Sequence, residues 1–339
     1  MLYAPVEMHA GKKYSVIDMA RWTRRESLLF LLLAIIPPAL ASLNLTPPHV
    51  PWQPVLLLGT AVAFMTGFKS NAAYDRLWEA RQIWGGIVNT SRTWAVMVTD
   101  FLLTNDPRLE AARSRLVHRH IAWLTALRYQ LRESRAWETI GDAENVEFLK
   151  RNYAIPERGT PLEAALRHVL SEEERAHVLA TKNRATHIIA RQSADLRTLV
   201  NDGHLSEFRH VELARTLSQL YEHQGRCERI KNFPYPRHFS TMNAIFMWMF
   251  IFSVPYGLYT ELNRVATSFY WLTVPMSFIV QWSFHSMDKI GRVTENPFEG
   301  GANDVPISAM ARTIEIDLRE LLGEKEIPPP LQPQHDILL

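Results

Sequence analysis

Four long runs of apolar residues interrupt an otherwise charged chain. None of them contains a charged residue, and they are Leu28–Leu45, Trp52–Phe68, Met242–Tyr259 and Ala266–Phe284. Because roughly 20 apolar residues in an α-helix span the hydrocarbon core of a bilayer, these runs predict four transmembrane helices. Pro37 and Pro38 lie inside the first run and predict a kink or an early end of its helix.

The distribution of basic residues predicts the orientation of these helices. Lysine and arginine are frequent before Leu28 and throughout the stretch from Lys69 to Arg237. The connection at residues 46–53 carries no charge, and the one at 260–268 carries only one acidic and one basic residue. Because basic segments stay on the cytoplasmic side of a membrane, both termini and the large middle region are predicted to be cytoplasmic.

These patterns divide the chain into six segments. They are a cytoplasmic N-terminal segment (1–27), a first transmembrane hairpin (28–70), a helical cytoplasmic domain (71–240), a second transmembrane hairpin (241–286), a cytoplasmic helical segment (287–326) and a Pro-rich tail (327–339) expected to be extended or mobile. Periodicity in the middle domain favours helices at 82–103, 108–134, 161–168, 171–181, 185–199 and 206–227, with a loop at 152–160. The expected fold class is all-α, an integral membrane protein with four transmembrane helices.

The second apolar run continues without a break into polar residues. Thr60, Phe64 and Phe68 are spaced by four residues and therefore share one face of a helix. Steps of three or four residues along the same face then reach Asn71, Asp75 and Glu79. Such a face suits a helix that lines a narrow apolar constriction opening into a wet vestibule.

The alternative interpretation is that this helix face packs inside the protein. The two phenylalanines would then be core residues, and Asp75 and Glu79 would pair with Arg76 and Arg81 to join cytoplasmic helices. Since a chain with four spans cannot surround a pore with a single such helix, the pore interpretation requires a cyclic oligomer.

Composition and motifs do not favour an enzyme or a nucleic-acid-binding protein. A formal charge of +2 on 339 residues provides no strongly basic surface. Cys227 is the single cysteine, which excludes an internal disulfide and a Cys-rich zinc site. His118 and His120 are two residues apart and face different directions on a helix. With no nucleophile motif, metal motif or glycine-rich phosphate loop in the sequence, we predict no catalytic residue, no metal site and no cofactor.

A secondary transporter is a further alternative. Pro37, Pro255 and Pro275, which lie inside the first, third and fourth apolar runs, are compatible with the broken helices of transporters. No internal repeat of the kind found in many transporters supports this interpretation.

Several sequence motifs resemble those of the prokaryotic bestrophin family. The longest is GFKSNAAYDRLWEARQIWG at Gly67–Gly85. The motif IKNFPYPRHF at Ile230–Phe239 precedes the third apolar run, and ENPF at Glu295–Phe298 and NDVP at Asn303–Pro306 follow the fourth. The resemblance extends over nearly the whole chain in the family's order.

The resemblance implies a channel of the cell inner membrane, built as a cyclic homopentamer with a helical cytoplasmic vestibule. Its partners would be permeant inorganic ions and membrane lipid, and not nucleic acid. By position, the hydrophobic neck of the channel would consist of Thr60, Phe64 and Phe68. A second, cytoplasmic constriction would fall in Asn183–Ala190, where Ile188 is the expected residue.

The sequence leaves the selectivity of such a channel open. The edges of phenyl rings carry partial positive charge and favour an anion, whereas unpaired carboxylates at Asp75 or Glu79 would concentrate cations. The family majority favours anions such as chloride, with a cation-selective channel of the same fold as the alternative. Animal relatives bind calcium through a dense acidic run, whereas Phe298–Asp304 contains only two carboxylates here, so calcium activation is not expected.

Overall fold

The computed structural model describes residues 14–102, 106–265 and 269–339. Every regular element in these ranges is a helix, and the one β-pairing among them is an isolated bridge between Gln334 and Ile337. The predicted all-α class is therefore confirmed. The start of the fourth apolar run, at 266–268, lies outside the described residues, as does the extreme N-terminal part of the first cytoplasmic segment.

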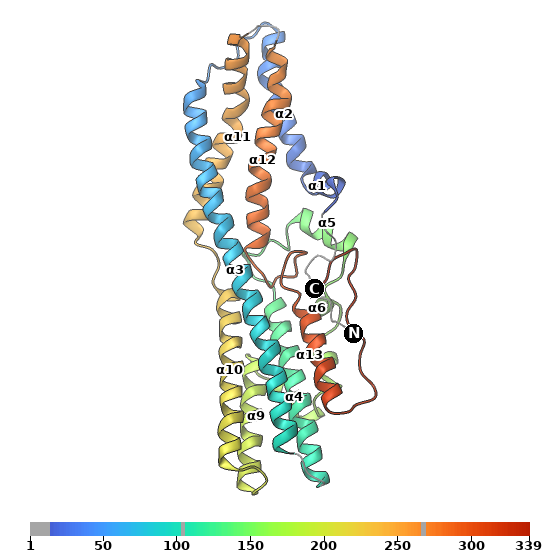
Figure 1. The fold of residues 1–339 in the computed structure, drawn as a ribbon. Coiled ribbons are helices and arrows are strands. Elements are labelled where there is room, and N and C mark those ends of the chain that lie inside the picture. Colours follow the sequence, from blue (N-terminus) through green and yellow to red (C-terminus); the bar gives the residue numbers. More distant parts are fainter. Residues whose placement is uncertain (1–13, 103–105, 266–268) are drawn as a thin grey trace.

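One helix, α3 (Trp52–Phe101), extends through both halves of the molecule. Its 50 residues rise about 75 Å at 1.5 Å per residue. In Figure 1 the first part of α3 belongs to an upper bundle with α2 (Arg24–Ser42), α11 (Arg237–Val265) and α12 (Thr273–Thr294), in which both α3 and α2 pack against α11 and α12. The prediction that the second apolar run continues into the polar domain as one helix is therefore confirmed.

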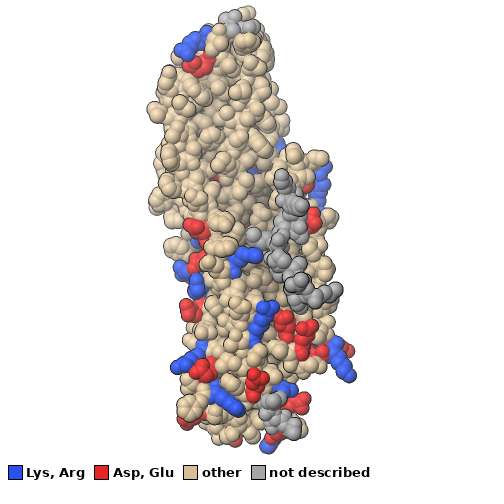
Figure 2. Space-filling model, in the orientation of Figure 1, with Lys and Arg blue, Asp and Glu red and all other residues tan. Residues whose placement is uncertain are grey.

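The upper bundle has the surface of a membrane domain. Three stretches of the described residues are long and apolar enough to cross a membrane, namely Arg24–Ser42, Trp52–Phe101 and Glu207–Val265, the last of which includes α11. On the face drawn in Figure 2, Lys, Arg, Asp and Glu side chains are almost confined to the lower half and to the upper tip. The expected first, second and third spans therefore coincide with helices of the upper bundle.

Helix α12 is not among these stretches, because one of its faces is polar. That polar face is turned inward: Thr273, Ser277 and Gln281 are all 0% exposed. The outward face is apolar, with Met276 and Ile279 about half exposed. This distribution is the reverse of that in a soluble helix and matches a helix whose apolar face meets lipid.

The paired prolines do not end the first span. Helix α2 continues through Pro37 and Pro38 to Ser42, and both prolines are buried together with Phe30 and Ala34. Proline lacks an N–H, so one intrahelical bond is lost at each position. Neighbouring helices compensate such losses in a membrane bundle, and here α11 and α12 pack against α2. The expected early end of the helix was wrong.

The lower half of α3 lies within a second helical bundle. Its neighbours are α4 (Pro107–Arg132), α10 (Glu207–Asn232) and α13 (Ile307–Leu321), and α9 (Arg184–Asn201) packs against α4 and α10 (Figure 1). They enclose one large apolar core in which Trp84, Trp94 and Trp123 are at most 1% exposed. The two short predicted helices are present as α7 (Leu162–Leu166) and α8 (Glu172–Leu179).

Four local features differ from the expectations. Two helices were missed, α1 (Val16–Trp22) and α5 (Ala143–Asn152), and the predicted loop at 152–160 contains the short helix α6 (Pro156–Gly159). The tail is not a free arm, because Ile337 and Leu339 are 3% and 6% exposed and pack in a small cluster with Tyr153. The apolar residues at the end of the tail anchor it to the domain, which its proline content did not indicate.

Candidate functional site along the exposed face of α3

Thr60, Phe64 and Phe68 lie on a face of α3 that no other part of the described chain covers. The two phenylalanines are 66% and 69% exposed, and Thr60 is also exposed. The hydroxyl of Thr60 donates to the carbonyl of Leu56 at 2.9 Å, so its hydrogen is held by its own helix. The sequence prediction that these residues share one helix face is consistent with this arrangement.

The opposite face of the same segment is buried against α11 and α12. Val55, Gly59 and Val62 are buried there. A Cβ atom on Gly59 would lie 2.6 Å from the Phe250 ring, so the glycine allows the two helices to approach closely. Packing inside the protomer thus determines which face of α3 remains exposed.

The exposed face continues below the aromatic residues with polar side chains. Asn71 and Asp75 are exposed, and within the described part of the chain no ion pair includes Asp75. Further down the same helix, Gln82, Asn89 and Thr93 are exposed as well. A protomer therefore presents one continuous stripe that changes from aromatic to polar.

Arg76 and Glu79 make contacts within the chain and are not part of this exposed stripe, although their spacing in the sequence suggested that they continue it. The Arg76 guanidinium donates to the carbonyls of Ile230, Phe233 and Glu295 at 2.7–2.9 Å. It thereby connects α3 to the end of α10 and to the end of α12. Glu79 pairs with Arg229 at 2.5 Å. Both residues brace a single protomer, and the alternative pairing of Asp75 and Glu79 with Arg76 and Arg81 is not observed among the described contacts.

A buried ion pair that the sequence analysis missed fixes the lower end of the upper bundle. The Lys69 ammonium lies 3.0 Å from the Asp288 carboxylate, with side chains 4% and 8% exposed. Asn243 also donates to Asp288, at 2.8 Å, so α3, α11 and α12 meet at one carboxylate. Lys69 follows Phe68 in the sequence, but about 100° of helical rotation turns its side chain into the protomer.

A second buried cation ties α12 to the first span. Lys289 Nζ lies 2.7 Å from the Glu26 carboxylate and 3.1 Å from that of Glu144, and donates to the Trp22 carbonyl at 3.0 Å. The same ammonium lies 4.7 Å from the centroid of the Trp22 ring. Because a charged side chain is costly to bury unpaired, these contacts hold α2, α5 and α12 together just below the upper bundle.

Ile188 does not fit the role expected of it. The side chain lies on α9 and is 0% exposed in the isolated protomer, as part of the large cytoplasmic core. A residue that narrows a lumen between subunits has to be exposed on each of them, so the burial of Ile188 in the single chain does not support this choice, and the position of the constriction stays a prediction. Within Asn183–Ala190 the exposed side chains are His187 and Ala190.

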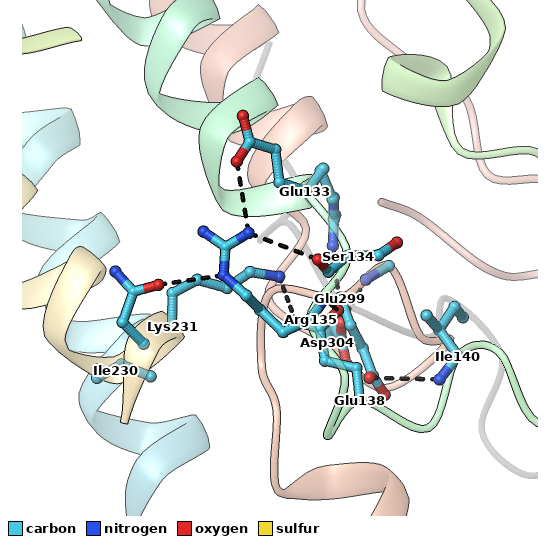
Figure 3. Close-up of polar contacts among 12 residues, drawn as sticks. Glu133, Ser134, Arg135, Glu138, Ile140, Ile230, Lys231, Glu299 and Asp304 are labelled. Atoms are coloured by element: carbon cyan, nitrogen blue, oxygen red, sulfur yellow. Dashed lines mark hydrogen bonds and ion pairs between the residues drawn. The ribbon is translucent and has the colours of Figure 1, made fainter. Parts of the chain in front are cut away.

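Buried carboxylates cluster in the loop that follows α12 (Figure 3). Glu299 is 2% exposed and accepts hydrogen bonds from the Thr139 N–H, the Thr139 hydroxyl and the Ile140 N–H, at 2.8, 2.8 and 3.3 Å. Burial and the nearby Asp304 carboxylate raise the pKa of Glu299 to about 8. Burial also raises the pKa of Asp304, to about 6, against the opposing effect of Arg132. This loop joins the end of α12 to the cytoplasmic domain.

The described residues contain no group of three or more His, Cys, Asp or Glu side chains arranged to hold a metal ion. His118 pairs with Glu324 at 2.9 Å, whereas His120 is buried beside the Trp123 ring. Burial lowers the pKa of His120 to about 3 and raises that of the Cys227 thiol. His120 and Cys227 are therefore buried in apolar surroundings, and both ring nitrogens of His118 are engaged by Ser114 and Glu324.

The chain matches the family described as bacterial/fungal bestrophin protein over residues 21–320. It is 27% identical to the voltage-dependent anion channel-forming protein YneE of Escherichia coli K12 over 280 residues, which are 83% of this chain and 80% of that protein. The chain is also 28% identical to the voltage-dependent anion channel-forming protein RSc3414 of Ralstonia nicotianae over 289 residues, which cover 82% of this chain and 83% of that protein. The crystal structure of a bacterial bestrophin homologue from Klebsiella pneumoniae superposes with a TM-score of 0.72 at 25% identity, covering 91% of this chain and 99% of that chain.

Proposed function

The chain belongs to the bacterial and fungal bestrophin family, and from this premise we propose that it assembles as a cyclic homopentamer around an ion pathway lined by α3. Relatives named as anion channel-forming proteins support an ion channel rather than an enzyme. The permeant species would be small inorganic anions such as chloride. The observation that carries the proposal is the exposed stripe of α3, which changes from aromatic to polar along one uninterrupted helix.

Exposure of this stripe in the isolated protomer is what an oligomer would explain. The Phe64 and Phe68 rings are more than half exposed, and exposed Asn71 and Asp75 lie directly below them. Lipid would not stabilise the polar part of this stripe, and water would not stabilise its aromatic part. Around a common axis the rings would form a narrow apolar neck, and the polar residues would line a wet vestibule. Thr60, Phe64 and Phe68 are thus the proposed neck.

We propose four membrane crossings, with α12 as the fourth. Its apolar side is exposed and its polar side is buried by α2, α3 and α11, so lipid would contact only apolar residues. Four crossings leave both termini and the lower bundle on the cytoplasmic side, as the basic residues favour. The upper bundle would lie in the inner membrane of the cell, and the lower bundle would surround the vestibule in the cytoplasm.

Selectivity would follow from two opposed features of the stripe. Inward-facing phenyl edges at the neck favour anions, and the names of the relatives agree with this. A cation-selective channel of the same fold is the second candidate, because Asp75 is exposed and the described ion pairs leave its carboxylate free to concentrate cations. Asp75→Asn separates the two candidates, since it would reduce cation but not anion permeation.

Purified protein in planar bilayers between unequal KCl solutions tests the proposal. A channel gives a passive current, and a reversal potential near that of chloride identifies anion permeation. Phe64→Ala and Phe68→Ala should change the conductance, whereas Phe252→Ala should not, because Phe252 is 51% exposed on α11 away from the stripe. Saturable exchange without current, or wild-type currents in both neck variants and in Thr60→Ala, would refute the pore. Native mass spectrometry should count five copies.

A further inference from the structure

A cavity of about 220 Å³ lies at the lower end of the upper bundle. Its walls come from α1, α5, the end of α12 and the loop that follows α12, and Trp22, Phe148, Ile290 and Val293 supply apolar surface. In Figure 1, α1 and α5 lie beside the lower end of α12. The cavity is therefore at the level where the proposed membrane domain meets the cytoplasm.

Polar groups in the wall of this cavity are bonded to one another. The Trp22 indole N–H donates to Asn145 at 3.1 Å. The Tyr14 hydroxyl donates to Asn303 at 3.0 Å. Glu299 accepts backbone N–H groups, and because burial raises its pKa to about 8, its carboxyl is uncharged at neutral pH. The cavity therefore suits an apolar occupant, with no charge in its wall that would oppose one.

The apolar side of α12 leads from the membrane domain to this cavity. Met276, Ile279, Met287 and Ile290 are 49–56% exposed, and their spacing places them on one side of the helix. This is the side that would contact lipid if α12 crosses the membrane. Because Ile290 also lines the cavity, an alkyl chain entering from the cytoplasmic leaflet would contact apolar surface along the whole path.

A smaller hollow of about 40 Å³ lies between α1 and α5, and Trp22 and Phe148 line both spaces. Charged side chains dominate the rest of its wall, namely Arg21, Arg24, Arg25 and Arg151 with Asp18, Glu144 and Glu147.

The pairing of these charges leaves cations available. Glu147 lies 2.8 Å from Arg24, and Glu144 lies 3.1 Å from Lys289. Within the described part of the chain, neither Arg21 nor Arg151 has an ion-pair partner. A guanidinium can bind a carboxylate through two parallel hydrogen bonds. The hollow therefore favours an anionic group beside the apolar cavity.

The size of the cavity limits the chain that it can hold. A cavity of about 150 Å³ lined by apolar side chains binds one benzene molecule. By proportion, a space of about 220 Å³ holds roughly eight or nine carbon atoms of an alkyl chain. A phospholipid carries two longer chains, so a molecule with a single chain fits this volume better.

We propose that the cavity binds a single-chain carboxylate, a fatty acid from the cytoplasmic leaflet, with its alkyl chain against Val293 and its carboxylate against Arg21. The inference rests on the position proposed above for the upper bundle in the membrane, and it does not depend on the axial pore. The bound chain joins α1, α5 and α12 by filling the space between them.

Equilibrium binding of radiolabelled decanoate tests the proposal. Purified protein is placed in phosphatidylcholine nanodiscs, and empty nanodiscs in a parallel dialysis cell measure the uptake by lipid alone. Binding above this uptake should saturate at one molecule for each protomer. Because burial of each CH₂ group strengthens binding about fourfold, the affinity for free ligand in water should rise about fourfold for each added carbon. It should level off at roughly nine carbons, where the cavity is full.

Variants at the two ends of the ligand separate its charge from its chain. Arg21→Gln should weaken decanoate binding about tenfold through loss of a charge-assisted hydrogen bond, and it should leave the binding of uncharged decanol unchanged. Arg264→Gln is the matched control, because Arg264 is 74% exposed at the opposite end of the upper bundle. Val293→Phe fills the cavity and should abolish saturable binding of both ligands. Ile279→Phe adds the same ring to the exposed side of α12 and should not.

Three results would overturn the proposal. They are equal binding by Val293→Phe and wild type, an affinity that does not depend on chain length, and loss of decanoate binding in phosphatidylglycerol nanodiscs, which would assign the cavity to a membrane phospholipid. Phe64→Ala should change the ionic current and leave decanoate binding unchanged. Decanoate binding by a protein that passes no current would therefore refute the axial pore alone.

Gel filtration separates loss of binding from loss of the fold. Arg21 is exposed, so Arg21→Gln should elute as wild type even if Val293→Phe does not. A well-folded Arg21→Gln variant with wild-type affinity for decanoate would show that the carboxylate does not bind there, and the assignment would be wrong.

Discussion

Replacing Glu299 by glutamine should make the stability of the protein much less dependent on pH. The pKa of Glu299 is raised from 4.5 to about 8 by burial and by the Asp304 carboxylate, so the folded chain holds a proton that the unfolded chain releases. Stability therefore falls as pH rises from about 4.5 to about 8, because over this range only the unfolded carboxyl is ionised. Below that range the Glu299 carboxyl is protonated in both the folded and the unfolded chain. Above it the carboxyl is ionised in both, and the loss of stability has reached its full size.

The size of the effect follows from the width of this range. Each pH unit between the two pKa values corresponds to about 1.4 kcal/mol, so the penalty above pH 8 is on the order of 2–5 kcal/mol for each protomer once relaxation of the loop is allowed for. Glutamine keeps the geometry, since its Oε1 can accept from the N–H groups of Thr139 and Ile140 while its Nε2 donates to the Thr139 hydroxyl. Asp304, with a pKa raised to about 6, leaves the variant some residual dependence at lower pH.

Thermal challenge of detergent-solubilised protein, followed by fluorescence-detected gel filtration, measures this effect. At pH 8.5 Glu299→Gln should withstand a higher temperature than wild type, whereas at pH 5 the two should be nearly equal. Glu133→Gln is the matched control, because the Glu133 side chain is 51% exposed and should not alter the profile. Equal pH dependence of Glu299→Gln and wild type would show that Glu299 is ionised in the fold and that the reasoning is wrong.

Three further predictions concern packing. Lys69→Met should cost roughly 3–5 kcal/mol by removing the buried cation of Asp288, whose other cation, Arg292 at 3.2 Å, is 39% exposed. Adding Asp288→Leu should restore much of the loss in the same thermal assay. Gly59→Ala should cost roughly 1–3 kcal/mol through overpacking, since its Cβ would lie 2.6 Å from the Phe250 ring, and adding Phe250→Leu should relieve it. The buried Cys227 thiol, with its raised pKa, should react with maleimide only after unfolding, and rapid labelling of native protein would contradict its placement.

Periodicity predicted the long helices because their patterns are long. The second apolar run and its polar continuation form one helix, as expected, and the cytoplasmic helices lie close to their predicted positions. Short elements were harder to predict. In α5 only 10 residues carry the pattern, and its stability comes from contacts such as that of Glu144 with Lys289, which is distant in the sequence.

Residue roles were less predictable than helices, because spacing shows which residues share a face and not what that face meets. Ile188 was chosen for a lumen from its place in the sequence, yet α4 and α10 cover that face of α9. Thr273, Ser277 and Gln281 of α12 recur every four residues in the sequence, but the run contains no charged residue and was interpreted as an ordinary span. Only the structure shows that its polar face is turned inward.

The proposed neck and the proposed fourth membrane crossing depend on the same division of α3 and α12 into inner and outer faces. On α3 the aromatic residues point away from the protomer, while Lys69, one residue after Phe68, points into it and holds Asp288. On α12 the polar residues point inward and the apolar ones outward. If Lys69 and Asp288 determine the rotation of both helices, then Lys69→Met should change the ionic current in addition to lowering the thermal stability. A wild-type current from a destabilised Lys69→Met variant would show that the exposed face of α3 is oriented independently of this ion pair.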